Sequence, residues 1–372
     1  MGSMDVHESA PQLVNWDLAA ATAARLAPPG PQLEPWEAAE AVASLRRLAD
    51  EAVPHVHRIT GLAAAKDLRD SQVLIVDRGS WAKANTQGFE VMLGPVLTQL
   101  IEKRASEITP SAARVGGALT GAQLGAVLAF LSSKVLGQYE PYAALASDST
   151  IPEGGRLLLV APNIVQIERE LNVEPDDFRL WVCLHEQTHR VQFAAAPWLR
   201  AHILEQVSQL SESLIGNMES LMERAAAAAK SLRERPWVSS GEPLPSRGAI
   251  LDLLQDPAEK AAISHLTAIM SLLEGHATVV MDAIDAEVVP TVKTIRQRYN
   301  ARNQNRGVLE TFIRRLLGLE AKMRQYTDGA KFVNAVVERI GMDGFNRIWE
   351  RPENLPTEEE IHAPEGWVAR MG

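Results

Sequence analysis

The sequence has almost no cysteine. Cys183 is the single cysteine among 372 residues, so no disulfide can form within the chain. Disulfides persist mainly in oxidising compartments. The first residues also lack the basic segment followed by an apolar run that is typical of a secretory signal. We therefore expect a cytoplasmic protein in which Cys183 serves packing.

Positive charge and long hydrophobic runs are also scarce. Lysine and arginine total 37 against 47 acidic residues, a formal net charge of −10, which argues against a nucleic-acid partner because phosphate neutralisation needs a basic face. The most apolar long stretch, Val115–Leu131, is rich in glycine and alanine and interrupted by Thr120 and Gln123. A membrane span needs about 20 mostly apolar residues. We expect a buried helix and no membrane span.

Helical patterning dominates what is present. Short apolar runs predict only two strands, Val73–Val76 and Arg156–Ala161. Apolar residues at three- and four-residue spacing predict helices over most of the remaining chain. They are expected over 16–26, 35–53, 110–136, 175–196, 198–232, 256–289, 307–325 and 329–340. The fold class is thus mainly α, or α+β with a few short strands. We expect a single domain over 1–372 with an exposed loop near 234–248.

One motif carries chemistry. His185, Glu186 and His189 form H-E-x-x-H within the helix that begins at Pro175. Residues four apart share a helix face, so both imidazoles can bind one metal ion. Glu186 would lie beside a metal-bound water, where a general base belongs. Buried His and Glu side chains need partners, and the motif predicts that zinc supplies them.

A catalytic zinc usually has three protein ligands and an open position for water. No further histidine and glycine follow His189 at the offset of an extended motif, so the third ligand lies elsewhere. Glu274 is the preferred candidate, because it shares a predicted apolar stripe with Met270, Ala277, Thr278 and Met281. His276 is the alternative.

Other groups have candidate roles. Asp282 is a candidate partner for a ligand histidine or a surface residue. Tyr326 is a candidate catalytic residue that would stabilise negative charge on the substrate oxygen, and Arg190 and Arg296 are further candidates for this role. For Tyr326, packing or capping of a helix is the alternative. The strand over 157–161 can pair with an extended substrate by analogy with other zinc peptidases.

Blocks along nearly the whole chain resemble one family. They include "FRLWVCLHEQTHRVQF", "SLLEGHATVVMD", "VDRGSWAKAN", "LLLVAPNI" and "LPTEEEIHAPEGWVARM". The chain is similar in these blocks to the type 2 zincin-like metallopeptidases of actinobacteria and related bacteria, some of which are labelled as associated with biosynthesis of the deazaflavin coenzyme. The resemblance implies a helical zincin-like core, zinc at His185 and His189, Glu186 as base and Glu274 as third ligand.

The resulting hypothesis is a zinc-dependent hydrolase, a metallopeptidase acting on a peptide or small amide. The alternative is a non-catalytic zinc protein that binds a partner. Structural zinc sites are usually closed by four ligands, often cysteines, and a single cysteine disfavours that alternative. A deazaflavin-coenzyme enzyme is a third hypothesis, and no Gly-rich phosphate loop supports it.

Overall fold

A computed structural model of the chain describes residues 12–66, 68–103, 109–216, 257–304 and 326–371. These form two compact units, each considered by itself. The first comprises Met1–Ala194 with Ile284–Gln297, and the second comprises Ala195–Ala283 with Arg298–Gly372. The predicted helix over 307–325 and the predicted loop near 234–248 lie outside the described residues. The single-domain interpretation stays a prediction.

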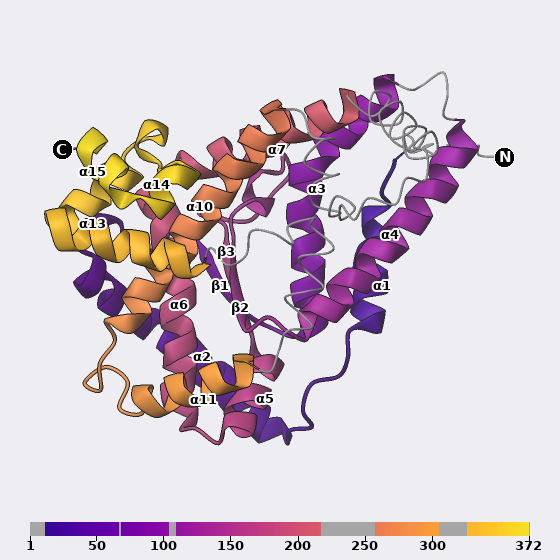
Figure 1. Ribbon diagram of the computed structural model, residues 1–372. Coiled ribbons are helices and arrows are strands. Elements are labelled where there is room, and N and C mark those ends of the chain that lie inside the picture. Colours follow the sequence, from indigo (N-terminus) through magenta and orange to yellow (C-terminus); the bar gives the residue numbers. More distant parts are fainter. Residues whose placement is uncertain (1–11, 67, 104–108, 217–256, 305–325, 372) are drawn as a thin grey trace, which may run out of the picture. The chain divides into compact units, whose positions relative to one another are not determined.

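The first unit contains a small mixed sheet (Figure 1). Its strands are β1 (Gln72–Val76), β2 (Gly137–Glu140) and β3 (Arg156–Val160). Their order is β1-β3-β2; β1 runs parallel to β3 and β2 antiparallel to it. β3 is therefore central, and all five of its residues are buried. The prediction that an extended substrate pairs with this strand was wrong, because β1 and β2 already use both of its edges.

Helices cover both faces of this sheet. The helices of the first unit are α1 (Trp16–Leu26), α2 (Pro35–Thr60), α3 (Arg78–Lys103), α4 (Pro110–Ser132), α5 (Ala161–Leu171), α6 (Pro175–Ala195) and the start of α11 (Val292–Gln304). Leu158 and Val160 pack against Trp81 of α3 and Leu128 of α4. On the opposite face, the Tyr139 ring of β2 lies 5.3 Å from that of Phe193 of α6. Side chains alternate along a strand, so Gly137 also faces α6.

α4 differs from the prediction of a buried helix. Ser111–Ser132 is long and apolar enough to cross a membrane by length and composition, but only 33% of its most apolar window is buried. Three of its glycines, Gly117, Gly121 and Gly125, face α1 and the residues just before it, where an added side chain would overlap the backbone. Val115 and Leu119 point outward and are 73% and 61% exposed. Glycines thus allow close packing against α1, whereas Val115 and Leu119 are left exposed.

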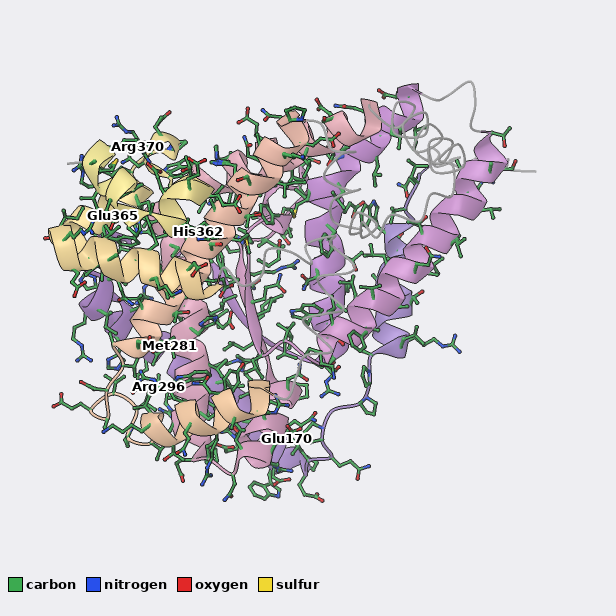
Figure 2. The ribbon with its side chains drawn as sticks, viewed as in Figure 1. Glu170, Met281, Arg296, His362, Glu365 and Arg370 are labelled. Atoms are coloured by element: carbon green, nitrogen blue, oxygen red, sulfur yellow. The ribbon has the colours of Figure 1, made fainter. Side chains whose placement is uncertain are left out.

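The second unit is helical in its described part. It contains α7 (Leu199–Gly216), α10 (Pro257–Asp282), α13 (Tyr326–Asn346), α14 (Glu358–His362) and α15 (Pro364–Met371). Ion pairs join its C-terminal helices, and Figure 2 labels three of the side chains: His362, Glu365 and Arg370. α10 ends at Asp282 and not near Val289 as predicted. The Asp285 carboxylate accepts from the N–H groups of Glu287 and Val288, a turn that competes with helix.

Candidate metal centre

α6 carries the H-E-x-x-H motif on a buried helix, as predicted. Acidic residues in its first turn, Asp176 and Asp177, suit the positive end of the helix dipole. On the side away from the sheet, the Gln187 amide donates to the Ala49 carbonyl of α2 at 2.8 Å. The Cys183 thiol is fully buried and lies 4.0 Å from the Leu45 carbonyl. Burial raises its pKa, so this cysteine serves packing as expected.

The two motif histidines converge on one point. His185 Nε2 and His189 Nε2 are 3.3 Å apart, and the rings meet edge to face. Two nitrogens bound to tetrahedral zinc at about 2.0–2.1 Å would lie about 3.3–3.4 Å apart. The pair therefore fits a zinc ion without a change of side-chain conformation. His189 Nδ1 lies 3.0 Å from Gln192 Oε1, a contact that fixes the ring and leaves Nε2 for a metal.

A second histidine pair in the other unit provides a contrast. His202 Nε2 of α7 and His265 Nε2 of α10 lie 2.7 Å apart. That separation fits a direct N–H···N hydrogen bond and is too short for two ligands of one zinc ion. Spacing thus separates a metal-type pair from a hydrogen-bonded pair within the same chain.

Glu186 lies against the edge strand β2. Its side chain is buried, 6% exposed. A Cβ atom on Gly137 would lie 2.6 Å from Glu186 Cγ and 2.7 Å from its carboxyl carbon. Because Gly137 has no side chain, it leaves the space that the Glu186 carboxylate occupies. Sequence analysis missed this residue, because β2 is a four-residue strand with no strong apolar pattern.

Glu274 and His276 occupy different surroundings on α10 of the second unit. Glu274 is half-buried, between buried Ala277 and exposed Met270. The predicted apolar stripe was therefore only partly correct, since Thr278 is exposed as well. This position lies at the boundary between the packed face of the helix and its open face. The role of Glu274 as third ligand stays a prediction.

His276 is fully buried. Its ring stacks on Phe345 with centroids 5.3 Å apart and lies 5.4 Å from Trp349. These contacts give it a packing role. Asp282 is exposed at the end of α10, which favours the surface alternative for that residue.

The remaining candidates differ in what their contacts allow. The Arg190 guanidinium is buried and donates to the Ser71 hydroxyl, to the Leu68 carbonyl at 3.0 Å and to other acceptors. It fastens α6 to the segment before β1. Arg296, labelled in Figure 2, donates to the Ile284 carbonyl at 2.9 Å. Tyr326 is the first residue of α13, and its side chain lies outside the described residues.

Comparison with known proteins agrees with this geometry. A family model described as zincin-like metallopeptidase matches residues 14–368. A solved structure from Chloroflexus aurantiacus, described as "a putative hydrolase with a novel fold", is similar with a TM-score of 0.65 and 28% identity. The similarity covers 96% of this chain and 98% of the other. Among curated proteins, no sequence matches the chain significantly.

Proposed function

The chain belongs to the zincin-like metallopeptidase family, and from that premise we propose that it is a zinc-dependent hydrolase that cleaves a peptide or small amide bond. The observation that carries the proposal is the pair of imidazole nitrogens 3.3 Å apart on α6, with the buried Glu186 between them in sequence. A bound zinc ion would supply Lewis acidity, polarising the scissile carbonyl and lowering the pKa of the attacking water to about 7.

Metal binding and proton transfer are assigned to different residues of α6. His185 and His189 would hold the metal, and Gln192 keeps the His189 ring in place. Glu186 accepts a proton from the attacking water and passes it to the leaving amine. Its burial against Gly137 limits the exposure and the movement of the carboxylate.

Glu274 is our proposal for the third ligand. Two imidazoles and one carboxylate are a donor set suited to a metal ion, and one that leaves a fourth position open for water. Glu274 is half-buried and lies in a largely buried segment of α10.

The edge strand β2 is our proposal for the substrate platform. Within the part of the chain that the structure describes, β2 pairs with β3 on one side and with no strand on the other. An extended peptide can hydrogen-bond to such an edge, and Gly137 would place it next to Glu186. Tyr326 remains our candidate for stabilising negative charge on the substrate oxygen. The actinobacterial and deazaflavin-coenzyme details of the resemblance stay predictions, and the proposal does not depend on them.

The test is a Glu186→Gln variant. The substitution keeps size and hydrogen-bonding reach but removes the base. We expect unchanged zinc content and at least about a 100-fold loss of hydrolysis of a substrate found by peptide-library screening. Glu51→Gln, on the exposed side of α2, is the matched control and should retain activity.

A hydroxamate probe extends the test to the case in which no substrate is found. Hydroxamates chelate zinc only where a coordination position is open. The zinc-loaded parent and the Glu186→Gln variant should both bind the probe. Failure of the fully loaded parent to bind would contradict the hydrolase proposal and favour a non-catalytic zinc protein.

A further inference from the structure

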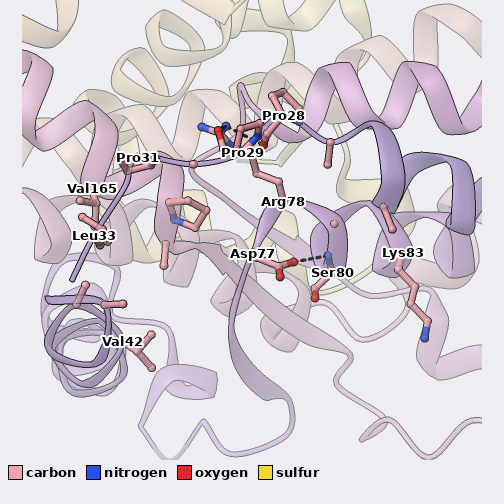
Figure 3. Close-up of a pocket in the computed structure, with 18 residues that line it drawn as sticks. Pro28, Pro29, Pro31, Leu33, Val42, Asp77, Arg78, Ser80, Lys83 and Val165 are labelled. Carbon is pink, nitrogen blue, oxygen red and sulfur yellow. Dashed lines mark hydrogen bonds between the residues drawn. The ribbon is translucent and has the colours of Figure 1, made fainter. Parts of the chain in front are cut away.

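A cavity of about 640 Å³ lies in the first unit, away from the motif on α6 (Figure 3). It sits at the carboxyl ends of the parallel strands β1 and β3. β1 ends at Val76, shortly before α3 begins at Arg78, and β3 ends at Val160, directly before α5 begins at Ala161. No residue of the H-E-x-x-H motif lines it.

The two connections leave the sheet in different directions. α3 packs with α1 and α4, whereas α5 packs with α2. The crevice between diverging connections, outside the carboxyl ends of parallel strands, is where α/β sheets bind ligands. Both helices also direct the positive ends of their dipoles toward this region, which favours an anion.

The cavity walls are mainly apolar. Its volume is within the range of about 300–1,000 Å³ that is typical of small-molecule sites. The apolar lining comes from the end of α1, the segment between α1 and α2, and the first two turns of α2 and α5. It includes Pro28, Pro29, Pro31, Leu33, Val42 and Val165. The cavity therefore suits a ligand with a compact apolar body.

The buried charge in the wall is the Arg78 guanidinium, and its hydrogen-bond acceptors are all neutral. Arg78 is only 5% exposed. It donates to Asn163 Oδ1 at 2.6 Å, to Gln166 Oε1 at 2.7 Å and to the carbonyls of the Pro28–Pro29 segment. None of these acceptors carries charge, and burial lowers the guanidinium pKa. A buried cation without a counter-ion is costly.

The neighbouring charges leave the cavity positive. Asp77 turns toward α3 and accepts from the Ser80 N–H at 2.7 Å, as Figure 3 shows, so it caps the helix. Lys83, one turn further along α3, also lines the cavity and is exposed. Arg78 and Lys83 thus give the cavity two cations against one capping carboxylate.

From these observations we propose that the cavity binds a phosphate monoester with a small apolar or ring-shaped body. The phosphate lies at the start of α3 near Arg78 and Lys83. The apolar body contacts the proline-rich segment and Val165. This is a binding site separate from the metal centre, and it does not depend on the proposed hydrolase activity.

The test uses phenyl phosphate as the probe and calorimetric titration of the full chain. We expect saturable binding by the parent, with phenol and inorganic phosphate each at least about 10-fold weaker because each supplies half of the recognition. Ala38→Trp, at an exposed lining position of α2, should fill the cavity and weaken binding at least about 10-fold. Lys83→Gln should weaken it roughly 3- to 10-fold.

Two controls localise the binding. Lys66→Gln removes an exposed lysine that does not line the cavity and should bind like the parent. A metal ion can also take a phosphate, so the His185→Ala, His189→Ala double variant is titrated too and should retain binding. Absence of saturable binding by the parent, parent-like binding by Ala38→Trp, or a preference for benzoate over phenyl phosphate would overturn the proposal.

Discussion

The placement of Glu186 depends on one glycine that lies 49 residues earlier in the chain. Gly137 belongs to β2 and Glu186 to α6, so only the tertiary fold brings them together. The motif on α6 could be predicted because its spacing is local: residues four apart share a helix face. The position of Gly137 beside Glu186 has no local signal in the sequence. The sequence therefore predicts the candidate reacting groups of α6 but not the residue that makes room for Glu186.

Gly137→Ala tests this positioning role. The added methyl group overlaps the Glu186 side chain, so the carboxylate must shift. We expect the kcat of hydrolysis to fall about 10- to 100-fold, because a misplaced general base loses much of its effect, while zinc content stays unchanged. Activity and metal content are measured on the same preparation. Parent-like kcat in a folded Gly137→Ala variant would contradict the role of Gly137.

At the scale of elements, sequence patterns located helices more accurately than their boundaries. The strand predicted over Arg156–Ala161 ends at Val160, and Pro162 lies in the first turn of α5, a position that tolerates a missing N–H. α3 was not predicted, because its buried residues follow no simple stripe. α2 continues through Pro54 to Thr60. Tertiary packing determines where these helices form and end, and a local sequence pattern does not contain that information.

Two glycines set the contact between α10 and α13 in the second unit. A Cβ atom at Gly275 would overlap the Gly329 backbone, and one at Gly329 would overlap the Ser271 carbonyl. We expect Gly329→Ala to destabilise the protein by about 1–3 kcal/mol through overpacking, although alanine is the better helix former. Urea unfolding midpoints measure the change.

Gly116→Ala is the matched control for that prediction. Gly116 lies within α4, and nothing lies within 4 Å of its added Cβ atom. The same substitution should therefore stabilise the protein by about 0.5–1 kcal/mol. If Gly329→Ala were equally stabilising, the close approach of α10 and α13 would be incorrect.

The hydrogen-bonded pair His202 and His265 makes the second unit sensitive to acid. Burial lowers the pKa of both imidazoles; Glu205 and Glu353 oppose this at His202, and His202 adds to it at His265. The folded-state pKa values lie below the usual 6.5, so the unfolded chain binds more protons as pH falls through about 6.5, and stability is lost on acidification.

Melting temperatures at pH 7.5 and pH 5.5 check this expectation. The parent should lose more on acidification than a variant with both His202→Gln and His265→Gln. Burial also lowers the pKa of His55. Because His55 and the other titratable groups are present in both proteins, their contribution cancels in the comparison. An equal loss in both proteins would show that the pair does not respond to pH in this range.

At the scale of the whole molecule, sequence and structure agree on a mainly helical fold with a small sheet. The family relationship extends over residues 14–368, so the resemblance seen in separate blocks reflects nearly the entire chain. The cavity beside α3 was not predicted. Its lining comes from α1, α2, α3 and α5 and the segments next to them, and no single stretch of sequence carries its pattern.

The central claim is that His185 and His189 hold a zinc ion with Glu274 as third ligand, and zinc content per chain tests it most directly. Purified protein, its His185→Ala, His189→Ala double variant, Glu274→Ala and His276→Ala are compared by elemental analysis at equal protein concentration. The account predicts about one zinc per chain in the parent and in His276→Ala, and strong loss in the other two. Full zinc in the double variant would contradict the account, and loss in His276→Ala without loss in Glu274→Ala would contradict the assignment of the third ligand.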